Sequence, residues 1–192
     1  MRIRNHQCFR TYLQRHTVSV AFVNSGFIDG NVPYVELPHL NYSRSFTFAA
    51  WISVASENVF SSDLTVVGQR RWARLFVQDR QQLAFAVDSG LPPVLVDTAM
   101  LVPNRWTFVA VTVSEEGGGS RISLYREVQP PVSILRPGSF YPDPDSSSPA
   151  IIGSDEADGT HSEAFAGSLD AVRIYDRALS ANEISVLYRE NE

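Results

Sequence analysis

The chain has 192 residues, of which 44% are hydrophobic and 19% charged, and its formal net charge is −5. This length suits one domain with a full core. All sixteen basic residues are arginines, which excludes a Schiff-base lysine, a phosphate-loop lysine and a lysine general base, because arginine stays protonated. Cys8 is the only cysteine, so an intramolecular disulfide and a cysteine-based zinc cluster are excluded.

The basic residues are placed unevenly, with a cluster at the N-terminus. Residues 1–28 hold four arginines and no acidic residue, a charge of +4 that leaves −9 for the rest of the chain. We treat residues 1–16 as a basic arm and residues 17–192 as one domain. A basic arm on an acidic body predicts docking on an acidic protein neighbour; the alternative is a solvated tail. The arginines expected to dock are Arg2, Arg4, Arg10 and Arg15. So few arginines do not predict nucleic-acid binding.

The sequence shows no membrane or export signal. No apolar run approaches the roughly 18 residues of a membrane helix, so we expect no contact with a membrane. The first eight residues lack the apolar segment of a signal peptide. We therefore expect either a mature fragment or a chain used without classical secretion.

Apolar and polar residues alternate with the two-residue period of a β-strand through most of the chain. In residues 46–54, Phe46 and Phe48 share one face and Trp51 lies on the other. Aromatic and β-branched residues fill these segments, as strands favour. The predicted strands cover residues 17–24, 33–37, 46–54, 64–68, 72–78, 82–88, 94–98, 106–113, 122–125, 150–153 and 169–175.

Turn-forming segments separate the strands. Residues 115–120 contain three consecutive glycines and predict a hairpin loop. Residues 130–149 hold six of the eleven prolines and predict a long exposed loop. Ser180, with Glu183 three residues later, predicts a capping box and a short helix. The whole pattern predicts an all-β fold: a two-sheet antiparallel jelly-roll sandwich with one short C-terminal helix.

The most specific motif lies at residues 165–188. It reads F-x-G-x-L-D followed by R-I-Y-x-R-x-L-S-x-x-E, and it resembles the closing signature of the laminin-G-like, concanavalin A-like lectin-glucanase superfamily. Further segments resemble that family in the same order, at residues 30–38, 46–52, 104–111, 122–125 and 151–154. The resemblance covers about residues 18–189 and implies a concanavalin A-like sandwich. Members of this superfamily bind ligands or, in some branches, cleave glycans.

Most residues of these motifs have a structural interpretation. Trp51 and Trp106 are large enough to anchor the inner faces of the two sheets. Gly167 suits a bulge or a close approach of two backbones. Arg173 is expected to form an ion pair at a strand edge with Asp170 or Asp176.

A sugar-binding site needs exposed aromatic faces beside polar groups. Trp72 and Arg74 begin a strand face that continues with Phe76 and Gln78. We interpret this face as a candidate contact surface for a glycan or a protein partner, and the alternative is a partly buried sheet face. The aromatic candidates in predicted loops are Tyr42, Phe140 and Tyr141.

The candidate calcium ligands are loop oxygens, which calcium prefers. Many relatives in the family carry such a site, and the neighbouring first and last strands of the sandwich imply a site at Asp29, Asn31 and Asp170. Against this, Pro33 stands where relatives often have an acidic residue. We therefore predict no cofactor, with calcium as the one alternative.

The glucanase branch of the family uses E-x-D-x-x-E on a strand. The nearest segment is Glu156-Ala-Asp158, which ends in His161 within a glycine-containing loop. We predict no catalytic residue.

Our leading hypothesis is a non-catalytic binding or structural module. It would act as a surface or decoration subunit of a virion or extracellular filament, docking through the arm and binding glycan or protein. The first alternative is a carbohydrate-binding module of a secreted protein, and the second is a glycoside hydrolase. The expected location is extracellular or on a virion surface.

Overall fold

The computed structural model describes residues 2–4, 12–14, 17–19, 34–37, 44–56, 63–69, 72–78, 81–87, 93–138, 149–157, 160–162 and 164–190. For residues 2–4, 12–14, 17–19, 156–157 and 160–162 it describes the backbone alone. The described part of the chain contains no helix that is both long and apolar enough to span a membrane.

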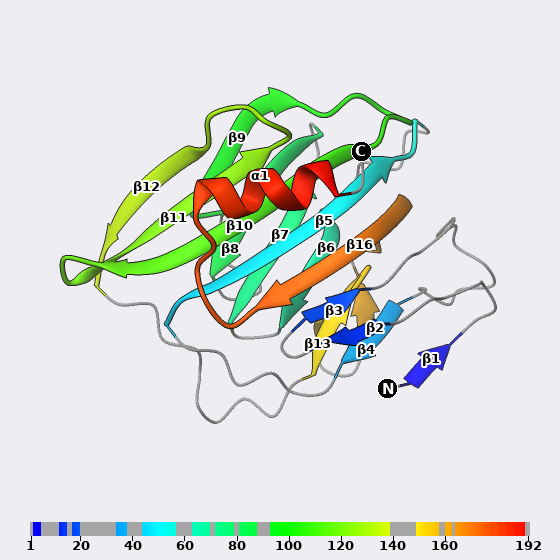
Figure 1. Ribbon diagram of the computed structural model, residues 1–192. Helices are drawn as coiled ribbons and strands as arrows, with labels where there is room; N and C mark the ends of the chain where they lie inside the picture. The colour runs from blue at the N-terminus through cyan, green and yellow to red at the C-terminus, as the bar shows by residue number, and fades with distance from the viewer. Residues whose placement is uncertain are drawn as a thin grey trace.

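The described strands build two main antiparallel sheets that pack face to face (Figure 1). The seven-stranded sheet has the order β1 (Arg2–Arg4), β4 (Tyr34–Leu37), β13 (Ala150–Ile152), β6 (Leu64–Gln69), β7 (Ala73–Gln78), β8 (Gln82–Val87) and β9 (Leu95–Met100). The five-stranded sheet has the order β12 (Val132–Pro137), β11 (Gly119–Arg126), β10 (Thr107–Glu116), β5 (Phe46–Val54) and β16 (Gly167–Tyr175).

Three smaller elements complete the described fold. Two short hairpins are formed by β2 (Tyr12–Gln14) with β3 (Thr17–Ser19), and by β14 (Asp155–Ala157) with β15 (Thr160–Ser162). The helix α1 (Ala181–Arg189) lies across the outer face of the five-stranded sheet (Figure 1). The predicted fold class, an antiparallel two-sheet sandwich with one C-terminal helix, is confirmed.

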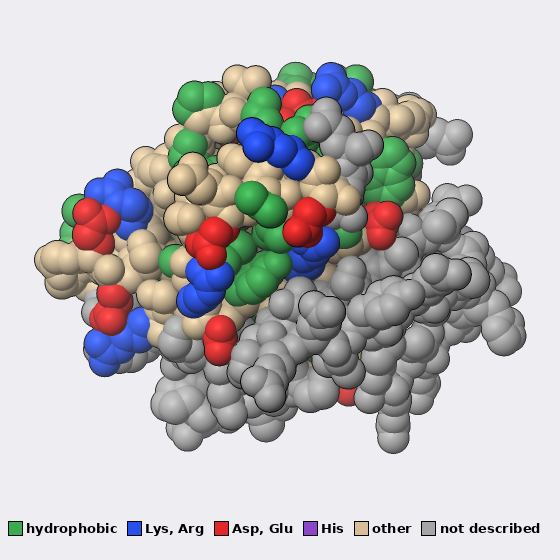
Figure 2. All heavy atoms as spheres, viewed as in Figure 1, with side chains coloured by type: hydrophobic (Ala, Val, Ile, Leu, Met, Phe, Trp, Pro, Cys, Tyr) green, Lys and Arg blue, Asp and Glu red, His purple; other side chains and the backbone are tan. Residues whose placement is uncertain are grey.

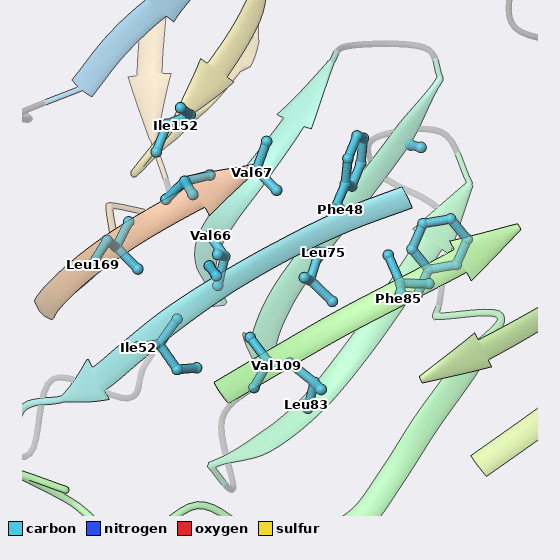
Figure 3. Close-up of a cluster of buried hydrophobic side chains, with 14 of the residues drawn as sticks. Phe48, Ile52, Val66, Val67, Leu75, Leu83, Phe85, Val109, Ile152 and Leu169 are labelled. Atoms are coloured by element: carbon cyan, nitrogen blue, oxygen red, sulfur yellow. The ribbon is translucent and has the colours of Figure 1, made fainter. Parts of the chain in front are cut away.

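The core lies between the two sheets. Figure 3 shows side chains of β5 and β10 pointing toward those of β6, β7 and β8. Phe46 and Phe48 of β5 fill its centre, as the alternation of residues 46–54 predicts. Trp72 is the largest fully buried side chain, with its ring centroid 4.3 Å from that of Phe46. Trp72, and neither Trp51 nor Trp106, is therefore the core tryptophan.

Trp51 and Trp106 do not anchor the inner faces, so that prediction is wrong. Since Phe46 and Phe48 face the core, the alternation of β5 sends Trp51 to the outer face of the sheet. There it stacks on Tyr188 of α1, with the ring centroids 5.5 Å apart. Trp106 precedes β10 and remains 44% exposed.

The connections differ from the predicted loops in two places. The loop at 115–120 is reduced to a two-residue turn, Gly117 and Gly118, whose φ angles of 56° and 79° suit a tight hairpin. The predicted loop 130–149 contains β12, which pairs with β11 as an exposed edge strand. The prolines in residues 130–138 lie around the ends of β12, where an edge strand tolerates them. Residues 139–148 lie outside the described residues.

The helix α1 is held to the sheet at its start and along its inner face. Ser180 Oγ accepts the Glu183 N–H at 3.3 Å, and the Glu183 carboxylate accepts the Ser180 N–H at 2.9 Å, which confirms the capping box. The same carboxylate pairs with Arg177 at 2.6 Å. These bonds from Arg177 and Ser180 lower the pKa of Glu183 to about 2. Ile184 and Leu187 pack on the outer face of the five-stranded sheet.

Strand β16 meets β5 at Gly167, as predicted from the sequence. Gly167 has a φ of +145°, and a Cβ atom added there would lie 2.0 Å from the carbonyl oxygen of Ser53. Only glycine fits this approach without separating the two strands. Farther along β16, Arg173 pairs with Glu190 at 2.7 Å, which differs from the predicted partners Asp170 and Asp176.

The described residues of the predicted arm form strands that pair with strands of the predicted domain. Strand β1 pairs with β4 at the edge of the seven-stranded sheet, and β2 pairs with β3 across the predicted boundary at residue 16. The division into an arm and a domain stays a prediction.

Candidate functional site

The outer face of the seven-stranded sheet carries the predicted contact residue Arg74. Arg74 belongs to β7 and lies opposite Gly68 of β6 and Ala86 of β8, so these two small residues are its cross-strand neighbours on this face. Arg74 is only 6% exposed, and Phe76 on the same face is fully buried. The structure therefore bears out the alternative interpretation, a buried sheet face, and the prediction of an exposed contact surface is wrong here.

Arg74 is held in a buried ionic cluster. Its guanidinium lies 2.9 Å from the carboxylate of Asp63 and 3.5 Å from that of Asp155. Its Cζ atom lies 4.1 Å from the centre of the Phe76 ring, a cation–π distance. Gly68 leaves room for the arginine stem, since a Cβ atom there would come within 3.3 Å of Arg74 Cγ. Two carboxylates against one guanidinium make this cluster a poor receptor for an anion.

Trp72 does not share the face of Arg74. The backbone N–H of Trp72 donates to the Gln69 carbonyl at 3.1 Å, which closes the turn between β6 and β7. The turn places the indole in the core, edge-on to Phe48 with the ring centroids 5.6 Å apart. A tryptophan that is only 1% exposed cannot present a face to a sugar, so Trp72 is withdrawn as a binding residue.

Several predicted site residues lie outside the described residues. These are the aromatic residues Tyr42, Phe140 and Tyr141, the calcium candidates Asp29 and Asn31, and the arm residues Arg10 and Arg15. Arg2 and Arg4 are described as backbone only. The roles assigned to all of these residues stay predictions.

Asp170, the third calcium candidate, lies at a bulge in β16. The following residue, Ala171, has a φ of +45°, and its N–H donates to Asp170 Oδ1 at 2.6 Å. Asp170 is exposed and lies opposite Trp51, on the outer side of the five-stranded sheet. Among the described residues, no three His, Cys, Asp or Glu side chains form a metal-binding group. Calcium binding stays a prediction.

The segment nearest to the glucanase motif forms a hairpin rather than the predicted loop. Glu156 of β14 lies opposite His161 of β15. Asp158 lies outside the described residues.

An exposed tryptophan marks a different candidate site, at the end of the five-stranded sheet. Trp106 follows a turn in which the Arg105 N–H donates to the Val102 carbonyl at 3.3 Å. The Asn104 N–H donates to Val54 at 2.7 Å, and Asn104 adopts a φ of +57°. These bonds hold the turn against the end of β5 and place Trp106 directly before β10.

The strand register identifies the neighbours of Trp106. Thr107 lies opposite Ile52, and the Asn104 N–H binds the Val54 carbonyl, so the residues between Asn104 and Thr107, Trp106 included, run past Ser53. Ser53 in turn lies opposite Ser168 of β16, two residues from Asp170. We call the surface formed by Trp106, Ser53, Ser168 and Asp170 the Trp106 face.

The helix α1 stops short of the Trp106 face. Its last turn packs on Trp51 and Phe108 through Tyr188, whose ring lies 5.5 Å and 6.0 Å from those two rings. Trp106 lies two residues before Phe108 and is left exposed. The sequence contains a signal for this outward position: Trp106 shares a strand face with Phe108 and Ala110, and the core residues of β10 lie on the other face. Our interpretation of Trp106 as a core anchor overlooked that signal.

Two arginines near the Trp106 face are paired with carboxylates of the chain. Arg105 pairs with Glu127 at 2.9 Å, and Arg173 pairs with Glu190. Figure 2, viewed from the side of α1, shows several basic and acidic side chains next to each other on this side of the molecule. Asp170 forms no ion pair with any residue that the structure describes. The face therefore combines an indole ring, two hydroxyl groups and one carboxylate that no described basic group neutralises.

Comparisons with known proteins agree on the fold. The similar structures include the carbohydrate-binding module CBM40 of the IT-sialidase from Ruminococcus gnavus. It matches with a TM-score of 0.68 and 12% identity, and the alignment covers 88% of this chain and 96% of that one. The same module bound to α2,3-sialyllactose matches with a TM-score of 0.62 and 14% identity, over 75% of this chain and 82% of that one. The heptameric pentraxin of Limulus polyphemus matches with a TM-score of 0.58 and 16% identity, over 92% of this chain and 84% of that one.

Other matches are larger than this chain. The binding domain of Paraclostridial Mosquitocidal Protein 1 has a TM-score of 0.62 and 17% identity; the alignment covers 95% of this chain but only 46% of that one. No curated protein sequence matches this chain significantly. A family model described as the concanavalin A-like lectin/glucanases superfamily matches residues 29–185. Since that match covers most of the sequence, the chain belongs to the concanavalin A-like lectin/glucanase superfamily, in its laminin-G-like branch.

Proposed function

We propose that this protein is a non-catalytic carbohydrate-binding module that binds glycan through the Trp106 face. The observation that carries the proposal is the 44% exposure of Trp106, the only exposed aromatic side chain among the residues that the structure describes. Sugars present C–H groups on the faces of their rings and hydroxyl groups at the edges. An exposed indole beside Ser53, Ser168 and Asp170 offers an apolar platform together with hydrogen-bonding groups, as small-ligand sites do.

The family and its structural neighbours support a binding role. The superfamily includes lectins, and one similar structure is a module bound to α2,3-sialyllactose. A non-catalytic role and an extracellular location agree with these relatives. The chain also lacks the E-x-D-x-x-E strand motif of the glucanase branch. The more specific role, a virion or filament subunit docking through Arg2, Arg4, Arg10 and Arg15, stays a prediction.

A glycan array followed by calorimetric titration of the strongest ligand tests the proposal. Trp106→Ala should weaken binding at least about tenfold, the usual effect of truncating a central aromatic contact. Leu135→Ala is the matched control, because Leu135 is similarly exposed but lies on β12, at the far edge of the five-stranded sheet. The control should bind like the unmodified protein, and both variants should keep its melting temperature. If the array detects no glycan, or if Trp106→Ala binds normally, the proposal is wrong.

A further inference from the structure

We propose that the Trp106 face selects neutral glycans and discriminates against acidic ones such as sialylated or uronate-containing sugars. This inference rests on the proposed function and adds the chemical class of the ligand. It departs from the similar module that is bound to sialyllactose, and it follows from how the charges of this chain are arranged.

The first observation is that most of the described arginines, although not Arg136 and Arg189, are already paired. A receptor for a sugar carboxylate usually supplies a guanidinium, which binds the two oxygens side by side. Of the nine arginine side chains that the structure describes, seven pair with a carboxylate of the protein. They include Arg105, the residue next to Trp106, whose guanidinium lies 2.9 Å from Glu127. Because Glu127 already balances the charge of Arg105, an acidic sugar at Arg105 would have to compete with that carboxylate.

The second observation is the carboxylate of Asp170. One of its oxygens is held by the Ala171 N–H at 2.6 Å, which fixes the side chain without neutralising its charge. The nearest arginine along β16, Arg173, is bound to Glu190. A fixed, exposed carboxylate accepts hydrogen bonds from sugar hydroxyls and repels a second carboxylate.

The strand register sets the size of the ligand that can meet both groups. β10 and β16 flank β5, so Trp106 and the Ser168–Asp170 segment are two strand spacings apart, or about 10 Å. A neutral oligosaccharide lying across β5 would stack one ring on Trp106 and donate hydroxyl hydrogen bonds to Asp170. An acidic sugar in the same place would bring its charge toward a carboxylate that no described basic side chain neutralises.

The test is an array on which each neutral glycan is printed beside its sialylated or uronate-containing counterpart, with lactose and α2,3-sialyllactose as one pair. The strongest neutral ligand and its acidic counterpart are then titrated. The neutral ligand should bind at least about tenfold more tightly at low salt, and the difference should shrink as salt screens the repulsion. Asp170→Asn should raise binding of the acidic ligand.

Asp176→Asn is the matched control for total charge. Asp176 is also exposed, directly after β16, and lies six residues from Asp170, about 20 Å along an extended strand. The two substitutions are compared at about 0.1 M salt, where the screening length is about 10 Å. Its substitution should leave the discrimination unchanged. Tighter binding of the acidic member of each pair, or equal effects of the two substitutions, overturns the inference while leaving glycan binding intact. If no glycan binds at all, the proposed function fails, and this inference fails with it.

Discussion

The buried ionic cluster around Arg74 gives the sharpest test of the interior. Arg74→Met removes the guanidinium but keeps an aliphatic stem over Phe76. The carboxylates of Asp63 and Asp155 then lose their common partner in a poorly hydrated site. The cluster lies on the outer face of the seven-stranded sheet, whereas Trp106 lies at the end of the five-stranded sheet. The substitution should therefore lower stability and leave glycan binding at Trp106 unaltered.

The expected loss of stability follows from the exposure of the three groups. Removing one partner of a fully buried ion pair costs about 3–5 kcal/mol. Here the side chains of Asp63 and Asp155 are 30% and 13% exposed, so they keep some hydration. We therefore expect a loss of about 2–3 kcal/mol, below the fully buried range. With a slope of about 2 kcal/mol per molar urea, the unfolding midpoint should fall by about 1–1.5 M.

Urea unfolding, followed by circular dichroism, measures this effect. The matched control is Arg105→Met, because the side chain of Arg105 is 61% exposed and its ion pair should be worth less than about 1 kcal/mol. Replacing Asp63 and Asp155 by Asn in the Arg74→Met background should recover part of the loss. If Arg74→Met and Arg105→Met unfold at the same urea concentration, Arg74 does not hold a buried ionic cluster.

Two further predictions concern the five-stranded sheet and its helix. Gly167→Ala should lower the unfolding free energy by at least about 2 kcal/mol, because the residue needs a glycine-only φ and its Cβ would meet the Ser53 carbonyl; a loss under 1 kcal/mol in urea unfolding contradicts this contact. Glu183 has a lowered pKa, about 2 in the folded chain, so its ionised form adds stability above its ordinary pKa near 4.5, and this stability is lost as the pH falls toward 2. The unmodified protein should therefore exceed Glu183→Gln in unfolding free energy by less at pH 2 than at pH 5. A difference that stays constant over this range contradicts the prediction.

The sandwich was predictable because its signal is local. The alternation in residues 46–54 follows from strand geometry, and the structure buries Phe46 and Phe48 on one face as that pattern requires. The capping box at Ser180 was predictable for the same reason, since its two residues lie within one helical turn. Strand β12 was missed because its short apolar run lies among prolines, which favour a loop.

The candidate site was less predictable because it depends on what covers each face. Alternation separates the two faces of a strand, but it does not show whether an outer face is exposed. Arg74 is buried with Asp63 and Asp155, which are 11 and 81 positions away in the sequence. Trp106 is exposed because α1 ends over Trp51 and Phe108, and that end point depends on the tertiary packing of Tyr188.

Quenching of tryptophan fluorescence tests the central claim most directly. The chain has three tryptophans; Trp72 is buried in the core, Trp51 lies under α1, and Trp106 is the most exposed. Acrylamide should therefore quench mainly Trp106, and Trp106→Phe should remove most of the quenchable signal. A bound glycan should protect that signal in proportion to its occupancy of the site. Saturation with a glycan that leaves the quenching of Trp106 unchanged would contradict the claim that sugar binds at the Trp106 face.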